Sequence, residues 1–363
     1  MTKKRLTALL LAIFMMSATM SAGCFGLNNK PSRTDTLLLF TDEESGLYGF
    51  MDVDCNIVIP AKFPYSVTRS FTGEYAIVLD PVSYRMGQIN KQGEWVIDPA
   101  YPGVINPISD GLIRYEDPIS YKIGYMNMKG YWAIEPQFVV AYDFSQGMAV
   151  VRDKELGRYG IIDTSGRWIV EPKYRLLQEF HEGLAYAREG KGDLAGYINT
   201  GGNWVIQPQF YPNASNMEHM FAEGLAAAVV DLGNDVYKKG YIRKDGSWAF
   251  TLENSENLYC GAFSEGLARV QNGTTGKYGF INTKGDWVIP AKFGRAEAFS
   301  GGLAVAADDV VGLKRYINKN GEWEIEPQFD VAFAFEKGFA LVRLIGDDVY
   351  ATIDTKGNVL RPK

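Results

Sequence analysis

Residues 277–290 read KYGFINTKGDWVIP, and this stretch decides the fold. It contains two runs rich in β-branched and aromatic residues, one around Tyr278 and one around Trp287, which are typical of strands. The Asn that opens the segment between them can hydrogen-bond its own backbone, and the Gly at its fourth position can adopt a positive φ, so a tight turn is predicted. A third short run, Gly266–Val270, comes before the pair. Together the three runs predict a three-stranded antiparallel meander.

The same pattern recurs along most of the chain. Every Trp occupies the position of Trp287, and successive Trp residues are 37, 36, 36, 44, 39 and 36 residues apart. A chain that repeats at this interval is an array of similar units, each packed on its neighbours. The repeat tryptophans are Trp95, Trp132, Trp168, Trp204, Trp248, Trp287 and Trp323.

The pattern gives nine meanders, starting at Leu37 and ending near Leu360. The first and ninth have Ile57 and Val359 at the Trp position, as expected of terminal repeats, which lack one neighbour. We predict an all-β fold, a tandem array of about nine three-stranded meanders forming an open, curved or superhelical array. A closed β-propeller is the alternative, but its blades have four strands, so the linkers would have to supply the fourth.

The N-terminus reads as an export signal. Cations at positions 3–5 precede an apolar run and then small residues, too short a stretch for a stable transmembrane helix. The run Ser21–Cys24 resembles a bacterial lipobox, with Ser21 where Leu is usual, and this resemblance implies that Cys24 is lipidated. The predicted organisation is a signal peptide at 1–23, a lipidated Cys and tether at 24–36, and a repeat domain at 37–363.

Composition narrows the choice of partners. Removing the three cations of the signal takes the formal charge from −6 to −9, and an acidic chain with scattered charges does not suggest nucleic acid. The predicted location is the extracytoplasmic side of a membrane. The remaining cysteines, Cys55 and Cys260, lie in units that are not neighbours, so we expect two unpaired thiols.

The repeat closely resembles the WG (KWG) repeat family. The resemblance rests on Lys277–Asn282, on Gly202–Pro208, and on the Phe-x-Glu-Gly-Leu-Ala runs at Phe180–Ala185 and Phe221–Ala226. It covers essentially residues 37–362. It implies a bacterial, often exported, β-rich protein with a binding role and no assigned chemistry.

The sequence contains no set of residues that marks catalysis. Its two histidines are His181, expected in an exposed turn, and His219, in an irregular linker, and no third group completes a triad. Glu182, Glu223 and Glu265 are interpreted as solvated turn residues, because other units have Gln, Gly or Lys there. The turn Asn and Asp residues need no ion, so we predict no metal and no cofactor.

Two features allow a functional interpretation. The Trp ladder could present platforms for sugar rings, but stacking alone would also require it, with each indole covering a Gly of the next unit. The spacing between Gly-Leu-Ala runs rises from 36 to 41 and 42 around the fifth to seventh units, and insertions in repeat arrays often lie on the binding face. The candidate binding residues in these loops are Tyr211, His219, Asp231, Asn234, Asp235, Tyr237 and Tyr259.

These observations predict a non-enzymatic, membrane-anchored binding or scaffold protein of the bacterial cell envelope. Its partner would be an envelope protein or a cell-wall glycan, in addition to the membrane reached through Cys24. The alternative is a hydrolase that acts on envelope glycan. A deep pocket with two carboxylates within reach of one bond would favour the hydrolase.

Overall fold

The computed structural model describes residues 36–64, 71, 73–99, 105–190, 192, 194–211, 217–234, 236–252 and 259–363. Every regular element in these ranges is a strand. The predicted signal peptide, Cys24 and nearly all of the tether lie outside the described residues. No helix in the described part is long and apolar enough to cross a membrane.

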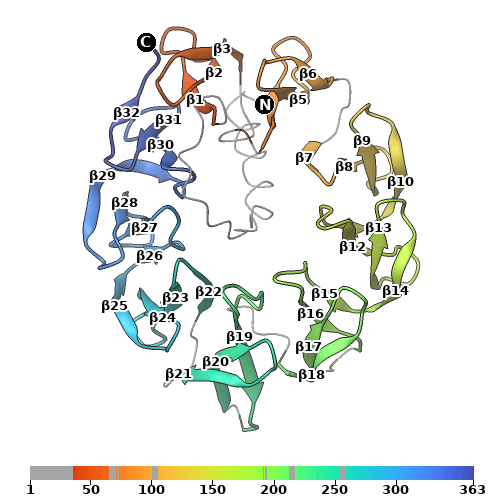
Figure 1. Cartoon of the computed structure of the whole chain (residues 1–363). Helices are drawn as coiled ribbons and strands as arrows, with labels where there is room; N and C mark the ends of the chain where they lie inside the picture. Colours follow the sequence, from red (N-terminus) through yellow and green to blue (C-terminus); the bar gives the residue numbers. More distant parts are fainter. Residues whose placement is uncertain are drawn as a thin grey trace. The chain divides into compact units, whose positions relative to one another are not determined.

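Nine meanders follow one another along the chain and are numbered here as units 1 to 9 (Figure 1). Units 1 to 3 contain β1 (Leu38–Thr41), β2 (Tyr48–Met51) and β3 (Ile57–Phe63); β4 (Tyr75–Leu79), β5 (Met86–Asn90) and β6 (Trp95–Ile97); and β7 (Ile105–Ser109), β8 (Leu112–Glu116), β9 (Ile123–Asn127) and β10 (Trp132–Phe138). Units 4 and 5 contain β11 (Val140–Ala141), β12 (Met148–Arg152), β13 (Tyr159–Asp163) and β14 (Trp168–Tyr174); and β15 (Leu176–Leu177), β16 (Ala185–Arg188), β17 (Ala195–Ile198) and β18 (Trp204–Phe210).

Units 6 and 7 contain β19 (Leu225–Asp231), β20 (Tyr237–Arg243) and β21 (Trp248–Leu252); and β22 (Cys260–Ser264), β23 (Leu267–Gln271), β24 (Tyr278–Asn282) and β25 (Trp287–Phe293). Units 8 and 9 share one sheet of β26 (Arg295–Ala296), β27 (Ala304–Ala307), β28 (Lys314–Ile317), β29 (Trp323–Ala332), β30 (Phe339–Leu344), β31 (Ala351–Asp354) and β32 (Val359–Leu360). All ladders between these strands are antiparallel, as in β12–β13, where Val150 faces Ile161. The predicted all-β tandem array of meanders is confirmed.

In most units the linker adds a fourth strand. β7, β11, β15, β22 and β26 each pair with the first meander strand of their unit, and the end of β29 does the same for β30. We name the three meander strands first, middle and third, and the added one the linker strand. A linker strand of this kind is what the β-propeller alternative requires.

The turn between the middle and third strands forms as the sequence predicts. In unit 7 the Asn282 side-chain oxygen accepts the N–H groups of Lys284 at 2.9 Å and Asp286 at 3.0 Å. Gly285 has φ +92°, and a Cβ there would lie 2.6 Å from the Phe250 ring of unit 6. Gly is therefore required twice, for its backbone conformation and for close packing between units.

Adjacent units are joined by one recurring hydrogen bond. A polar group on the middle strand donates to a main-chain carbonyl of the next unit, as Tyr125 donates to Tyr142 at 2.6 Å. The same arrangement is made by Gln88 to Asn106, Tyr197 to His219, Tyr241 to Gly261 and Tyr316 to Phe333. In unit 9 the hydroxyl of Thr352 donates to the carbonyl of Leu39 in unit 1 at 2.6 Å. Unit 9 therefore donates a hydrogen bond to unit 1 from the same middle-strand position, although the acceptor lies on β1 and not in a linker.

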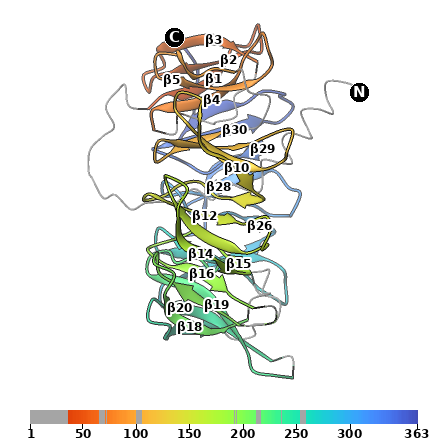
Figure 2. The ribbon, with the colours of Figure 1, turned by 90° about the vertical axis from the view of Figure 1, so that its right-hand side faces the viewer.

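Further contacts join the two ends of the array. Leu38 and Phe40 of unit 1 share a core cluster with Phe339 and Leu360 of unit 9. The Thr41 hydroxyl also donates to the Tyr350 carbonyl at 2.8 Å, and β1 lies beside β31 (Figure 1). Figure 2 shows β30 of unit 9 in blue close to the red strands of unit 1. We predicted an open, curved or superhelical array, with a closed propeller as the alternative, and in the structure these contacts bring the first and last units of the array together. The choice depends on a small rotation between units, which the repeat pattern does not specify.

The repeat Trp residues begin the third strands and are only partly buried. Trp95 and Trp168 cover Gly87 and Gly160, where a Cβ would lie within 2.9 Å of the indole. These glycines belong to the same unit as the Trp, so the prediction of a glycine in the next unit was wrong. The reason is the antiparallel pairing, which places the middle strand directly beside the third.

In four units within the described residues, the Trp ring contacts an aromatic residue of the preceding unit instead. The Trp ring meets, edge to face, the aromatic residue that ends the third strand of the preceding unit, as Trp168 meets Phe138 at 6.0 Å. Equivalent contacts join Phe63 to Trp95, Tyr174 to Trp204 and Phe293 to Trp323. Trp287 is 44% exposed, and the third strand before it ends at Leu252 instead of an aromatic residue.

The two cysteines in the described residues are free thiols, as predicted. Cys260 is fully buried, and burial raises the pKa of its thiol to about 12. A thiol with so high a pKa carries almost no thiolate at neutral pH, so it is a packing residue.

Candidate functional site

The strongest departure from the repeat is unit 6. β19 and β20 are seven residues each, whereas the corresponding strands of most other units have four or five. Their ladder continues to the pair Asp231 and Tyr237. The hairpin between them therefore extends further than those of the neighbouring units.

The end of this hairpin is built as a stable turn with apolar side chains exposed. The Asp231 carboxylate accepts the N–H of Gly233 at 2.7 Å, and Asn234 adopts φ +53°, which Asn tolerates better than most residues. Leu232 is 61% exposed and Val236 is 54% exposed. Asp235, the fourth residue of the turn, lies outside the described residues.

Two predicted site residues form the base of the hairpin. The rings of Tyr211 and Tyr237 lie 5.7 Å apart at an angle of 54°. Tyr211 donates its N–H to the Val229 carbonyl at 2.8 Å, which fixes the preceding loop to β19. One described residue from each of the first two irregular loops is thus in contact with the other.

His219 has a structural place and is not exposed at this surface. It is 5% exposed and stacks on Tyr186 with ring centroids 4.2 Å apart. Its Nδ1 lies 3.1 Å from the Ala227 carbonyl, and its own carbonyl accepts the Tyr197 hydroxyl. A buried imidazole in these contacts is not available to an external ligand, so its place among the candidate binding residues was wrong; the linker containing it follows β19 inward.

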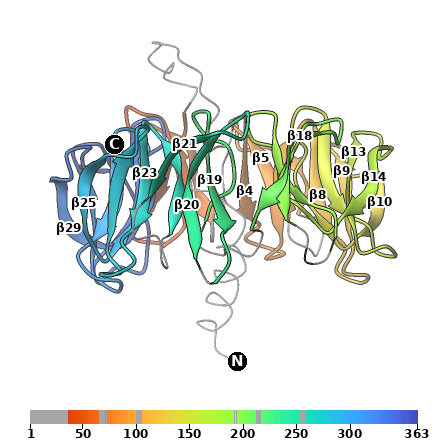
Figure 3. The same ribbon diagram turned by 90° about the horizontal axis from the view of Figure 1, so that it is seen from below.

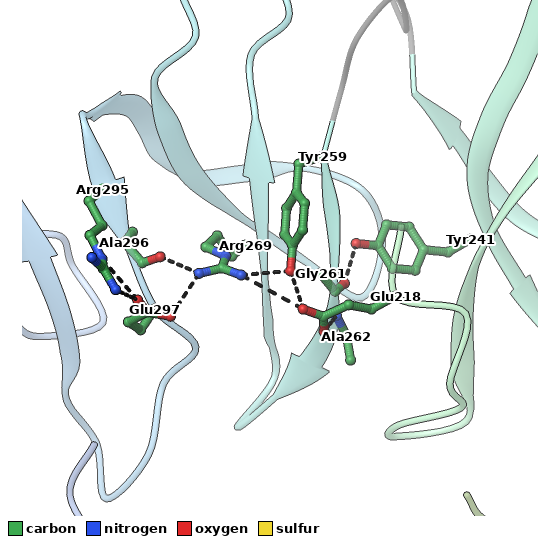
Figure 4. A network of polar contacts seen from close by, with 9 residues as sticks. All are labelled: Glu218, Tyr241, Tyr259, Gly261, Ala262, Arg269, Arg295, Ala296 and Glu297. Atoms are coloured by element: carbon green, nitrogen blue, oxygen red, sulfur yellow. Dashed lines mark hydrogen bonds and ion pairs between the residues drawn. The ribbon is translucent and has the colours of Figure 1, made fainter. Parts of the chain in front are cut away.

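Tyr259, from the third irregular loop, belongs to a polar network centred on Arg269 (Figure 4). Arg269 donates to the Tyr259 oxygen at 2.6 Å and to Glu297 at 3.0 Å, and its guanidinium lies 4.6 Å from the Tyr259 ring centroid. Tyr259 in turn donates to Glu218, whose other oxygen accepts the Ala262 N–H at 2.8 Å. The network therefore joins units 6, 7 and 8.

The electrostatics of this network favour a structural role. Burial is the largest cause that raises the pKa of Tyr259 well above its ordinary value, opposed by Arg269 and assisted by Glu218. Burial would lower the pKa of Arg269, but Tyr259 and Glu297 raise it by more. Both groups keep their protons throughout the neutral range, so neither is suited to transfer one.

The carboxylates before the Gly-Leu-Ala runs are also engaged. Glu182, Glu223 and Glu265 each accept the N–H of the corresponding Gly in the next unit at about 3.0–3.1 Å, and Asp110 does so at 2.7 Å. We interpreted the three glutamates as solvated turn residues, and their positive φ angles confirm the turn. Their additional role, a carboxylate contact between units, was not visible in the sequence because the partner is about 40 residues away.

A feature that the sequence analysis missed is the distribution of exposed apolar side chains. The turns between first and middle strands, called first hairpins here, carry a large exposed apolar residue in seven of the nine units within the described residues. These residues are Val82, Tyr84, Ile119, Tyr121, Leu156, Leu194, Leu232, Val236, Val310, Val311, Leu313 and Ile345. A break in polarity at each first hairpin was the available signal, since turns are normally polar.

The first hairpins lie on one face of the repeat region. Arg158 in the hairpin of unit 4 donates to the Glu189 carbonyl in that of unit 5, and Lys277 of unit 7 donates to the Asp308 carbonyl of unit 8 at 2.8 Å. The glutamate-to-glycine contacts join the units at the opposite ends of the first strands. Figure 3 shows the strands running between these two faces.

No group of three or more His, Cys, Asp or Glu side chains suited to a metal ion occurs within the described ranges. The exposed hairpin side chains, most of them aliphatic, are the residues that could form a surface site.

Comparison with known families identifies the repeat. A family model described as "WG containing repeat" matches residues 86–117, 123–156, 159–192, 196–211, 278–307 and 315–346. The chain belongs to the WG-repeat family. The unmatched stretch in the middle contains unit 6, whose hairpin and third strand depart from the pattern. No curated protein sequence matches the chain.

Several solved structures are similar in fold at low sequence identity. Apo AztD from Citrobacter koseri is 14% identical with a TM-score of 0.40, covering 81% of this chain and 96% of that one. BamB from Moraxella catarrhalis is 11% identical with a TM-score of 0.39, covering 83% and 95%. Hsv2p from Kluyveromyces lactis is 10% identical with a TM-score of 0.40, covering 69% and 90%.

Proposed function

We propose that this WG-repeat protein is a non-enzymatic binding protein of the bacterial cell envelope, anchored by a lipid on Cys24, and that its partner is a protein that contacts the hairpin of unit 6. The observation that carries the proposal is the extended β19–β20 ladder, which presents Leu232 and Val236 to solvent on a rigid base. Exposed apolar side chains on a fixed support are typical of protein contact sites.

Several charged side chains of units 6 and 7 are engaged in contacts between units, which supports a binding role over catalysis. The turn carboxylates accept hydrogen bonds from the next unit, and Arg269 is held by Tyr259 and Glu297. Each of these groups joins units together. A role in binding uses the surface that remains exposed and leaves these contacts in place.

The binding site can be tested by removing the hairpin without disturbing the ladder. Asp231 and Tyr237 face each other, so residues 232–236 can be replaced by the two-residue Asn-Gly turn that such a pair accepts. The variant should keep the thermal stability of the parent, because loop length affects stability little, and should lose an envelope protein that the parent recovers by affinity purification.

The matched control is the same replacement in unit 7, where Gln271 faces Tyr278 and residues 272–277 form the turn. This control should recover the partner. Recovery of every partner by the unit 6 variant would contradict the proposal, as would release of soluble fragments from peptidoglycan by the purified parent.

The anchor has a separate test. Cys24→Ser should accumulate unprocessed precursor and abolish maturation that is sensitive to globomycin, because the lipid-specific peptidase needs a modified Cys. Normal processing of this variant, with unchanged partition into detergent, would contradict the lipoprotein assignment and leave the binding assignment standing.

A further inference from the structure

The first hairpins of units 2 and 3 are nearly the same six residues. Residues 80–85 read DPVSYR and residues 117–122 read DPISYK. Val82 and Ile119 are 86% and 87% exposed, and Tyr84 and Tyr121 are 65% and 74% exposed. Each hairpin therefore places an aliphatic side chain and an aromatic ring in water and follows them with a cation. We call these two segments the twin hairpins.

The backbone of the twin hairpins is less favourable than the repeat requires. Both Tyr84 and Tyr121 have φ +55°, at a position where units 1, 4 and 7 have Gly46, Gly157 and Gly276 with φ between +61° and +68°. A side chain in this conformation is destabilising. The exposed rings return little packing energy to the fold, so the choice of Tyr over Gly points to a contact outside the chain.

The turns themselves are fixed by their acidic residues. Asp80 accepts the Ser83 N–H at 2.6 Å, and Asp117 accepts the Ser120 N–H at 2.9 Å. These hydrogen bonds lower the pKa of each carboxyl, led by the Ser83 N–H for Asp80 and by the Ser120 hydroxyl for Asp117. The backbone that carries the aliphatic and aromatic side chains is thus fixed before any partner is met.

We propose that the twin hairpins insert their apolar tips into the surface of a lipid bilayer. Val82 and Ile119 would enter the acyl boundary, and Tyr84 and Tyr121 would lie at the headgroup level, where amphipathic rings are enriched. Arg85 and Lys122 follow directly, and cations beside an apolar insertion are attracted by anionic lipids.

A bilayer fits these side chains better than a protein or a sugar does. The apolar groups stand on separate convex turns from neighbouring units, so a rigid partner would need two matching pockets, whereas a fluid surface needs none. A sugar could stack on the Tyr rings, but it would leave the aliphatic tips beside them, which are 86–87% exposed, in water. The first hairpins of units 8 and 9 each carry two Asp residues, whereas each twin hairpin carries one Asp and ends in a cation, so the proposal is limited to units 2 and 3.

The inference rests on the proposed function in one respect, the anchor. A tether of about 12 residues has an r.m.s. reach of roughly 20 Å, which would hold the repeat region near the bilayer and raise its local concentration there. Weak insertion at two hairpins would then be enough to fix the orientation of the region.

The test uses residues 25–363, which have no lipid and retain the complete repeat region with its ends in contact. Flotation with vesicles of phosphatidylethanolamine and phosphatidylglycerol measures binding without the anchor. The variant Val82→Ser/Ile119→Ser should bind at least tenfold more weakly than the parent. The matched control Val58→Ser/Ile169→Ser alters side chains that are 42% and 43% exposed on third strands, and it should bind as the parent does.

The proposal is overturned if the parent does not float with the vesicles, if the twin-hairpin variant floats as well as the parent, or if the control loses binding equally. It is also overturned if the variant keeps vesicle binding but loses an envelope protein, because the hairpins would then bind protein. These outcomes are separate from the proposed function, whose tests change Cys24 or the hairpin of unit 6.

Discussion

Replacing Trp168 by Ala should destabilise the protein by more than replacing Trp287, although both residues occupy the same repeat position. Trp168 is largely buried and meets the Phe138 ring edge to face at 6.0 Å. Trp287 is 44% exposed and follows a unit whose third strand ends without an aromatic residue. Comparing the two variants therefore separates the contribution of burial to stability from the contribution of the repeat position.

The magnitudes follow from the area that each indole hides. A Trp side chain buries about 200 Å², and Trp168 has intermediate exposure and hides at least about two thirds of it, so at about 25 cal/mol per Å² the loss is about 3 kcal/mol or more. The edge-to-face contact adds about 0.5–1.5 kcal/mol. Trp287 is 44% exposed, so it hides a little over half of its area and should lose about 2.5–3 kcal/mol, without the contribution of an aromatic contact.

Urea unfolding followed by circular dichroism measures both variants against the parent. The midpoint should fall further for Trp168→Ala, with little change in slope if unfolding stays cooperative. Equal midpoints for the two variants would refute the reasoning that contact with the preceding unit sets the contribution. An unchanged midpoint for Trp168→Ala would refute the packing role itself and favour the sugar-platform interpretation.

Three further predictions concern the array. Gly202→Ala should destabilise the protein by about 1–3 kcal/mol more than Gly183→Ala. Both glycines have a positive φ, but only a Cβ at position 202 would meet a neighbour, the Val170 side chain at 2.7 Å. Thermal unfolding of the two variants measures the difference, and equal losses of stability would contradict the prediction. Burial raises the pKa of Glu179 and Asp143 raises it further, opposed by Arg114, so the folded state binds that proton more tightly than the unfolded state. The stability that protonated Glu179 contributes is fully present below about pH 4.5 and is lost as the pH rises through the pKa of Glu179 in the folded state. Glu179→Gln should therefore reduce the fall in unfolding free energy over this pH range. Parallel curves of stability against pH for parent and variant would contradict the prediction. Finally, the variant Glu43→Cys/Arg361→Cys should form an intrachain crosslink with a short bis-maleimide, because Glu43 and Arg361 form an ion pair between units 1 and 9. The control variant Glu43→Cys/Lys244→Cys should form none. A crosslink in neither variant would mean that units 1 and 9 are apart.

The repeat was predictable because its determinants are local. The turn that contains Asn282 and Gly285 and the strand that starts at Trp287 lie within a dozen residues, so the sequence alone predicts the meander and its nine-fold recurrence. The Gly at the turn was expected for its φ, and the structure adds that it also packs against the preceding unit.

What could not be predicted depends on contacts between units. The Thr352 hydrogen bond to Leu39 joins residues 313 positions apart and follows from the rotation between successive units. The burial of His219 depends on Tyr186, a residue of the preceding unit. The exposed Trp287 follows a unit whose third strand ends without an aromatic residue. No single repeat contains the information for these features.

The position of the candidate site could be predicted from the sequence, but only some of its residues could. The longer spacing around units 5 to 7 located the hairpin of unit 6, and Tyr211 and Tyr237 do come together at its base. Tyr259 is engaged by Arg269, because the network needs groups from three units. The exposed hairpin residues Leu232 and Val236 were not predicted, because turns are normally polar and aliphatic side chains are not expected to be exposed there.

Site-specific photo-crosslinking tests the central claim most directly, that the hairpin of unit 6 binds an envelope protein. A photoreactive phenylalanine analogue at Val236 in the full chain, activated in intact cells, should give one discrete protein adduct. The same analogue at Val288, which is 42% exposed on a third strand of unit 7, should give none. No adduct at Val236, or the same adduct at both positions, would contradict the account.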